Sequence, residues 1–210
     1  WHVIVLNDAE RRVDAGTAAM LVLLAPIFVI GLAAVFLKER TTPNLLLGSA
    51  IAFAGVVVIG FATSTGNTSL AGVVLCLVAA LVSAIGLVAE KPALVRISAL
   101  QATWICCAVG ALFCAPYAPL LLRELRAAPA SGTAWLVFLG VFPTSIAFTA
   151  WAYALARGSA GRVVATAYLV PPLTIVMGWL LLGELPPGIA VLGGALCLVG
   201  VYIARKGPAS

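Results

Sequence analysis

The sequence predicts an all-α integral membrane protein, a polytopic bundle of transmembrane helices. Three observations carry this prediction: the composition, a series of apolar runs long enough to span a bilayer, and an internal repeat. Hydrophobic residues make up 63% of the 210 residues, charged residues only 9%, and the mean hydropathy is +1.18. A water-soluble domain carries about 25% charged residues, because its surface must be covered by polar groups. Lipid removes that requirement.

Seven apolar runs have about the 20-residue length that a spanning helix needs. Thr and Pro precede the second run and two Pro precede the last, and both residue types favour helix starts. Residues 63–69 and 127–133 are polar and predict a turn and a longer loop. Upstream, residues 1–6 look like the end of a further span. The seven predicted spans are 17–37, 45–62, 70–89, 100–122, 134–155, 163–182 and 189–204.

The charged residues are informative about topology. The net charge of +5 is spread singly and in pairs between apolar runs, so no basic stripe indicates nucleic-acid binding. Alternating the connections places four of the basic residues on one side of the membrane and eight on the other. By the positive-inside rule the second side, which includes Arg205 and Lys206, is cytoplasmic. We therefore expect a multi-pass protein of the cell membrane with its C-terminus in the cytoplasm.

The sequence repeats itself at an offset of 145 residues. In one register Pro26 matches Pro171, Glu39 matches Glu184, Gly48 matches Gly193, and Gly55 matches Gly200. About five spans separate the two Glu, so they lie on opposite faces and the repeats are inverted. We expect residues 1–62 to be the end of a first repeat and residues 69–206 a complete second one. About three further spans are then expected before Thr17 in the whole protein.

These motifs resemble a known family. The first copy reads DAGTAAMLVLLAPIFVIGLAAVFLKER and then LLLGSAIAFAGVVVIG; the second reads GSAGRVVATAYLVPPLTIVMGWLLLGE and then VLGGALCLVGVYIA. Both copies, with the preceding TSIAFTAWAYAL, resemble EamA-type members of the drug/metabolite transporter superfamily. The resemblance implies a ten-span protein of two five-span inverted repeats around a central cavity. It also implies transport, commonly outward, of amino acids, metabolites or drugs.

Several residues are candidates for the walls of such a cavity. Pro26 and Pro171 lie inside spans, where a Pro bends the helix and frees a carbonyl; a plain structural kink is the alternative. The other candidates are aromatic or neutral polar residues. For Trp and Tyr the alternative is a place in the interfacial belt, and for Thr it is a bond to a carbonyl of its own helix. These candidates are Tyr168, Trp151, Trp104, Thr166 and Thr144.

Two further sets of matched residues have structural interpretations. Glu39 and Glu184 are either gating or proton-linked groups, or carboxylates that complement the N-terminal dipole of the next helix. Gly48 and Gly55 share one helix face, as do Gly193 and Gly200. Small residues let helices approach closely in lipid, so we expect these faces to pack on each other or between the protomers of a homodimer.

The residue types that are absent from the predicted spans narrow the range of possible substrates and functions. No charged residue lies near the middle of a predicted span, which disfavours phosphorylated or cationic substrates and favours neutral, zwitterionic or aromatic ones. The five Cys lie in apolar runs, where buried packing is expected, and no motif indicates a metal, a cofactor or an enzyme. The sequence therefore predicts a secondary transporter that exports small neutral or zwitterionic metabolites, amino acids or drug-like compounds, across the membrane by alternating access. A channel or a non-transporting scaffold is the alternative.

Overall fold

The computed structural model describes residues 12–64, 69–183 and 185–206, and every regular element in these ranges is a helix. Seven of its helical stretches are long and apolar enough to cross a membrane. The predicted fold class and the number of spans are therefore confirmed. Residues 1–6, residues 65–68 of the predicted turn, and Glu184 lie outside the described residues.

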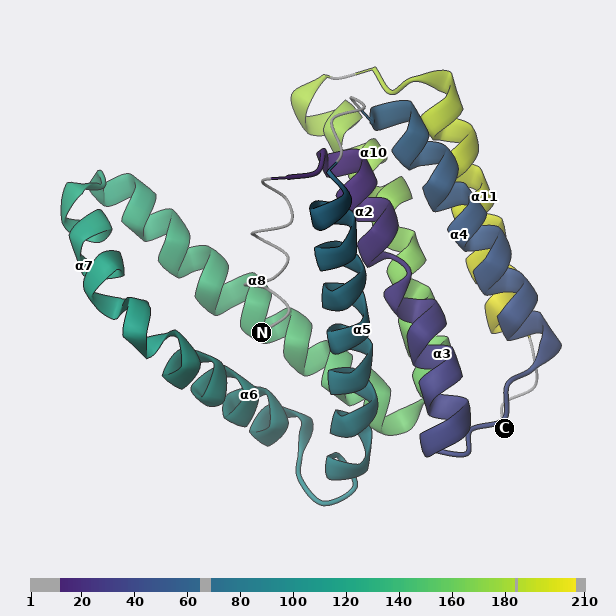
Figure 1. The fold of residues 1–210 in the computed structure, drawn as a ribbon, viewed down its shortest axis with the longest axis horizontal. Helices are drawn as coiled ribbons and strands as arrows, with labels where there is room; N and C mark the ends of the chain where they lie inside the picture. Colours follow the sequence, from purple (N-terminus) through teal and green to yellow (C-terminus); the bar gives the residue numbers. More distant parts are fainter. Residues whose placement is uncertain (1–11, 65–68, 184, 207–210) are drawn as a thin grey trace. The chain divides into compact units, whose positions relative to one another are not determined.

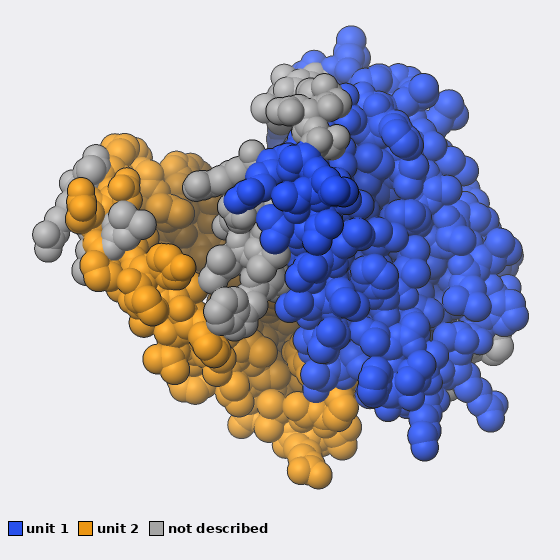
Figure 2. Space-filling model, viewed as in Figure 1, with its two compact units in different colours: residues 1–89, 159–210 blue, residues 90–158 orange. Residues whose placement is uncertain are grey.

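The chain divides into two compact units, Trp1–Ala89 with Ser159–Ser210, and Glu90–Gly158 (Figure 2). In the first unit α4 and α11 run side by side, α2 packs on α4, and α3 packs on the short helix α9 (Figure 1). Its helices are α2 (Ala15–Val22), α3 (Ala25–Phe36), α4 (Pro43–Thr63), most of α5 (Leu70–Ala93), α9 (Ala160–Ala165), η2 (Thr166–Leu169), α10 (Val170–Leu182) and α11 (Gly188–Arg205).

The second unit is a helical hairpin. Its first arm is α6 (Ala99–Cys114), the single turn η1 (Ala115–Tyr117) and α7 (Ala118–Ala127); its second arm is α8 (Ala130–Arg157), which packs on α6. Ser98 begins α6 with a capping box: its hydroxyl accepts the N–H of Gln101, and the Gln101 side chain accepts the N–H of Ser98. The ammonium of Lys91 donates to the Gly158 carbonyl at 2.7 Å and ties the two ends of this unit together.

Two predicted helix boundaries are wrong, and in both cases a Pro residue interrupts or begins a helix at a place that the prediction did not mark. The predicted span 100–122 is interrupted at η1, where Pro116 cannot donate an N–H to the helix. The predicted loop 127–133 is only a break at Ala128 and Pro129, because Pro129 takes the N-cap position and α8 begins directly after it. The expectation of buried cysteines holds for Cys76 and Cys197 but fails for Cys106, Cys107 and Cys114, which are exposed on α6.

Candidate functional site

The closest helix contact in the first unit joins α4 to α11 through the four matched glycines. A Cβ on Gly55 would lie 2.5 Å from the carbonyl oxygen of Gly193, and one on Gly200 would lie 2.5 Å from the carbonyl oxygen of Gly48. No side chain fits at such distances, so the two backbones touch directly. As the numbering rises along α4 it falls along α11, and the helices are therefore antiparallel.

The partners in this contact are exchanged in the way that a two-fold axis requires. Gly48 and Gly55 match Gly193 and Gly200 in the sequence, yet Gly48 faces Gly200 and Gly55 faces Gly193. Midway between them the thiol of Cys197 donates to the carbonyl of Ala52 at 3.4 Å, and these two residues are themselves 145 positions apart. The pattern puts a local pseudo-two-fold axis at Ala52 and Cys197.

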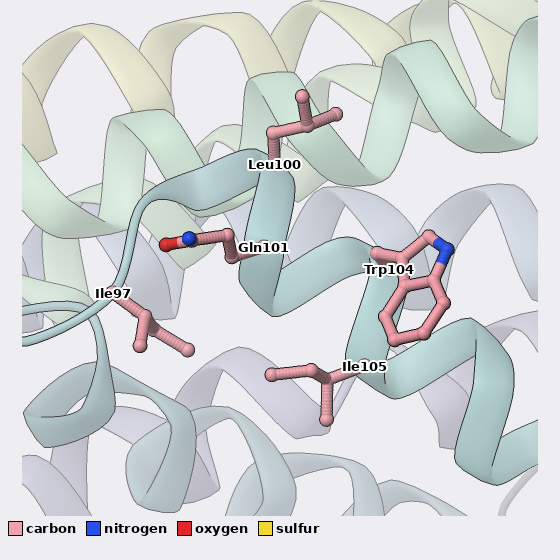
Figure 3. Close-up of a pocket in the computed structure, with 5 residues that line it drawn as sticks. All are labelled: Ile97, Leu100, Gln101, Trp104 and Ile105. Atoms are coloured by element: carbon pink, nitrogen blue, oxygen red, sulfur yellow. The ribbon is translucent and has the colours of Figure 1, made fainter.

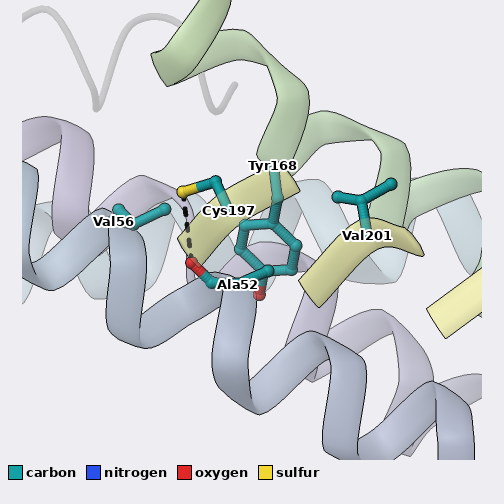
Figure 4. Packing of buried hydrophobic residues seen from close by; sticks show 5 residues of the cluster. All are labelled: Ala52, Val56, Tyr168, Cys197 and Val201. Atoms are coloured by element: carbon teal, nitrogen blue, oxygen red, sulfur yellow. Dashed lines mark hydrogen bonds between the residues drawn. The ribbon is translucent and has the colours of Figure 1, made fainter. Parts of the chain in front are cut away.

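Tyr168 reaches this axis and is completely buried, with 0% of its surface exposed (Figure 4). Its ring packs against Ala52, Val56, Cys197 and Val201, and Leu23, its match in the first copy, packs on the same cluster. Within the described part of the chain the Tyr168 hydroxyl has no hydrogen-bond partner. A buried hydroxyl without a partner costs free energy, and such groups in a native fold call for an explanation.

Tyr168 and Leu23 mark the points where two spans break. The first span breaks at Leu23 and Leu24, between α2 and α3, and Pro26 lies in the first turn of α3. The second breaks at the 3₁₀ turn η2, and Pro171 lies in the first turn of α10. An α-helical residue 171 would donate to the Ala167 carbonyl; because Pro cannot, the N–H of Val170 donates there instead.

The broken spans begin at differently capped helix ends. Asp14 accepts the Thr17 N–H at 3.0 Å and caps α2 locally; its other oxygen accepts the hydroxyls of Thr17 and Ser64. The pKa of Asp14 is lowered chiefly by the hydrogen bond from the Thr17 N–H, and desolvation of the carboxylate opposes this shift.

The start of α9 is capped differently, because the side chain of its N-cap residue Ser159 makes no such bond. The N–H of Ala160 there donates to both carboxylate oxygens of Glu39, at 3.1 and 2.9 Å.

Glu39 therefore corrects one sequence-based interpretation. As the alternative to a gating or proton-linked role, its carboxylate was expected to complement the helix that follows it, yet it binds the start of α9, 121 residues away. The backbone explains how it gets there. Lys38 adopts a left-handed conformation with φ 52°, and the Glu39 N–H returns to the Ala33 carbonyl, which ends α3 in a tight turn. The matched residue Gly183 is also left-handed, with φ 71°.

An apolar groove of about 390 Å³ runs between α3 and α4. Ser49 lines it and is 2% exposed, and its hydroxyl has no hydrogen-bond partner within the described residues. The matched position in α11 is Gly194, against which Pro172 and Ile175 of α10 pack. Their own matches, Ile27 and Ile30, line the groove instead. The two copies thus differ here: a groove runs between α3 and α4, whereas α10 packs directly on α11.

The profile of the EamA-like transporter family matches residues 2–61 and 70–205. The chain belongs to this family. It is 40% identical over 206 residues to a probable terminal-alkyne amino-acid exporter of Streptantibioticus cattleyicolor, covering 98% of this chain and 69% of that protein. It is 32% identical to the transporter YdfC of Bacillus subtilis, covering 96% of this chain and 66% of that one.

The EamA-family chain is also similar to a further relative and to a solved structure. A probable amino-acid metabolite efflux pump of Salmonella typhimurium is 28% identical, with 90% of this chain and 67% of the pump covered. A crystal structure with a TM-score of 0.78 and 22% identity covers 98% of this chain and 73% of its own, and this likeness concerns the fold. The chain thus spans about two thirds to three quarters of the proteins it resembles.

Of the other candidate residues of this EamA-family chain, Trp104, Trp151 and Thr144 lie in the second unit and Thr166 lies in the first. Trp104 is 71% exposed and lines a shallow apolar recess of about 510 Å³ on α6, with Gln101 and three aliphatic residues (Figure 3). Trp151 is half-buried on α8. The Thr144 hydroxyl donates to the Leu139 carbonyl at 2.8 Å, and that of Thr166 in the first unit to the Val163 carbonyl at 2.6 Å. Both bonds are the helix-internal alternative named above; a cavity role for any of these residues stays a prediction.

Sequence reasoning missed two residues of the first unit that the structure singles out. Asp14 is a common N-cap type directly before a predicted span, so its position carried a usable signal. Ser49 differs from its match Gly194, although its neighbours Gly48 and Ala50 are repeated at Gly193 and Ala195. A polar residue between two repeated small residues was the available signal for it.

Proposed function

We propose that this chain forms most of a secondary transporter that exports small neutral or zwitterionic metabolites, first of all amino acids and their derivatives, by alternating access. The observation that carries the proposal is the exchanged glycine contact between α4 and α11, with Ala52 and Cys197 at its centre. Inverted repeats joined on such an axis can exchange conformations and so open one site to either side in turn.

The chemistry of the described spans supports the proposed substrate class. Their apolar middle sections hold no charged residue within the described part of the chain, as expected for a substrate without a fixed net charge. Two relatives are named for amino acids or their metabolites, one as an exporter and one as an efflux pump. We take residues 1–62 and 69–206 as parts of the two inverted repeats, with the C-terminus in the cytoplasm. A homodimer would need a surface other than the glycine faces, which are used within the chain.

The first test compares the metabolites released by cells. Cells expressing the complete reading frame, and cells carrying the empty vector, are grown in a defined medium that is then profiled for amino acids, nucleobases and common drugs. We expect a small set of neutral or zwitterionic compounds, amino acids among them, to accumulate outside only with the protein. Equal profiles would contradict export.

The second test separates a carrier from a pore. Purified full-length protein is placed in liposomes preloaded with an enriched compound, and uptake of its labelled form is followed. A carrier gives saturable uptake that preloading accelerates, because the loaded site returns faster than the empty one. Flux that rises linearly with concentration and ignores preloading would favour a channel, and no flux above protein-free liposomes would favour a scaffold.

A further inference from the structure

The groove between α3 and α4 is apolar along almost all of its length. It begins beside Thr41, in the connection that joins the two helices at one end (Figure 1). Most of its lining comes from Ile27, Ile30, Gly31, Ala34, Leu46 and Ala50. A zwitterionic metabolite would leave its charges without partners against such a lining, so the group that fits the groove is a hydrocarbon chain.

The length of the groove fits a lipid chain from one leaflet of the membrane. From Ala34, near the connection, to Ile27 the groove follows about two turns of α3, which is about 10 Å. The hydrocarbon of one leaflet is about 15 Å thick, half of the bilayer core. A further transmembrane helix would instead need a contact surface that continues across both leaflets.

Two cations lie in the connection at which the groove begins. Lys38 and Arg40 are both exposed there. The carboxylate of Glu39, between them in the sequence, accepts the Ala160 N–H of α9. Lys and Arg bind phosphate oxygens by charge-assisted hydrogen bonds, and each one near an anionic membrane surface strengthens the attraction about 5-fold. The connection therefore suits the phosphate of a phospholipid whose chain lies in the groove.

The second copy of the repeat lacks both the cations and the groove. Uncharged residues replace the two cations, and larger side chains replace two small residues of the lining. The matched pairs are Lys38 and Gly183, Arg40 and Leu185, Gly31 and Val176, and Ala34 and Trp179. Positive charge at the end of a span follows from the positive-inside rule alone. Its occurrence together with the groove in one copy, and the absence of both in the other, points to a ligand with an anionic head and an apolar tail.

We propose that the groove between α3 and α4 and the cations of its connection bind one anionic phospholipid. The phosphate lies at Lys38 and Arg40, and one acyl chain lies along the groove. An acyl chain makes no demand on the Ser49 hydroxyl, which has no hydrogen-bond partner within the described residues. The site is distinct from the substrate site of the proposed transporter and does not depend on transport.

The experiment counts bound lipids on the purified full-length protein by native mass spectrometry. The protein is titrated in neutral detergent with phosphatidylglycerol or with phosphatidylcholine of the same acyl chains. We expect the wild type to bind phosphatidylglycerol more tightly. Lys38→Asn combined with Arg40→Gln should weaken phosphatidylglycerol binding about 25-fold, about 5-fold for each cation, and leave phosphatidylcholine binding little changed. Asn is chosen because it tolerates the left-handed backbone of residue 38.

A second pair of cations is the control for charge. Arg205 and Lys206 are exposed at the end of α11 and do not line the groove. Arg205→Gln combined with Lys206→Gln removes the same charge, yet should leave phosphatidylglycerol binding within about 3-fold of the wild type, because distant charges are screened. Equal losses for the two double variants would overturn the site and leave a general attraction between basic residues and anionic lipid.

Gly31→Leu tests the groove itself. A Cβ on Gly31 meets nothing within 4 Å, so the variant is expected to fold, and its side chain fills space that the acyl chain would occupy. Binding of both lipids should be lost while the preference for phosphatidylglycerol among any remaining binding is kept. Gly178→Leu is the matched control, because a Cβ on Gly178 in α10 also meets nothing and lies outside the groove. It should bind both lipids as the wild type does.

Three other outcomes would overturn the proposal. If excess inorganic phosphate displaces phosphatidylglycerol and Gly31→Leu binds normally, the cations recognise a free phosphate and the groove is not used. If Gly31→Leu binds lipid normally but melts at a lower temperature than Gly178→Leu, another transmembrane helix occupies the groove. If Ser49→Ala loses as much binding as Gly31→Leu, the occupant is a polar molecule. None of these measurements involves counterflow, so failure of the lipid site and failure of the transport proposal are distinguished.

Discussion

The two matched stretches, residues 14–64 and 159–206, agree where backbones meet and differ where side chains fill space. Both contain a broken span with Pro in the first turn after the break, a left-handed residue at its end, and a helix that packs through two glycines. They differ in the residue at the break, in the cap of the first half-helix, and in the packing of the second half-helix. Constraints on backbone geometry have thus kept the copies alike, while side chains have diverged.

Three of the differences between the two copies bear on the candidate site. Leu23 in one copy corresponds to Tyr168 in the other, and Asp14 corresponds to Ser159. The open groove beside Ser49 corresponds to the close packing of Pro172 on Gly194. These differences lie at the break, at the cap of the first half-helix and in the packing of the second half-helix, so each can be tested by substitution in one copy.

The largest effect is expected at the shared glycine contact. Gly48→Leu would drive a side chain into the backbone of Gly200 and Ala204, so α4 and α11 must separate. We expect a loss of about 4–5 kcal/mol in the free energy of unfolding, or no folded protein, because no rotamer relieves a clash with backbone. Denaturation in mixed detergent micelles measures it.

Gly178→Leu is the control for that substitution. Gly178 lies on α10, and a Cβ there meets nothing within 4 Å. Removing a glycine from a helix interior should stabilise this site by up to about 1 kcal/mol. Similar losses for both variants would mean that leucine is simply disfavoured and that the α4–α11 contact is not special.

The second effect tests the unequal residues at the breaks. Tyr168→Ala should cost about 3 kcal/mol by leaving a cavity in the cluster around Ala52 and Cys197. Tyr168→Phe removes only a hydroxyl that has no partner, so it should leave stability unchanged or raise it by about 1 kcal/mol. Stability to denaturant and counterflow would be measured on both variants.

Stability and counterflow, measured together, show what the Tyr168 hydroxyl contributes. If Tyr168→Phe is stable but transports poorly, the hydroxyl acts in the cycle and the cavity prediction for Tyr168 gains support. If Tyr168→Phe matches the wild type in both, the hydroxyl is a tolerated cost and the residue acts through its ring. A destabilised Tyr168→Phe would show that the hydroxyl has a partner in the folded protein.

Much of the fold was readable from the sequence because its determinants are local. Apolar length sets the spans, and Pro and Gly set the breaks, so seven spans and the matched register could be predicted. The ends of the spans could not be placed to the residue, since a Pro such as Pro129 can either end a helix or begin one. In an apolar chain the hydropathy pattern does not distinguish these two uses.

The candidate site was less accessible because its contacts are long-range. Glu39 was recognised as a matched carboxylate, but nothing near it in the sequence points to Ala160. Tyr168 was recognised as an aromatic beside a Pro, but its complete burial depends on how α4, α11 and η2 meet. The missed Ser49 is a small residue on a helix face of small residues, and only the geometry shows that its hydroxyl is unbonded.

The third effect concerns the buried hydroxyl of Ser49. Ser49→Ala should raise the free energy of unfolding by about 1 kcal/mol, because it removes a buried polar group without a partner. Ser98→Ala is the contrast, since the Ser98 hydroxyl accepts the Gln101 N–H and its loss should cost about 1 kcal/mol. Denaturant curves of both variants measure the difference. A destabilised Ser49→Ala would imply a bound partner in the groove between α3 and α4.

The smallest effect is the pH dependence of the Asp14 cap at the start of α2. The pKa of Asp14 lies below its usual 3.8 in the folded protein, chiefly because its carboxylate accepts the Thr17 N–H. The stability that Asp14 adds relative to Asp14→Asn is therefore fully present above about pH 4 and is lost as the pH falls through the lower folded pKa. Hydrogen exchange of the first-turn amides of α2, followed from pH 6 down to pH 2.5, reports the loss as faster opening in the wild type only. Equal pH profiles for wild type and Asp14→Asn would show that α2 is held by its packing on α4 and that its cap is dispensable, which would remove one of the differences between the two copies.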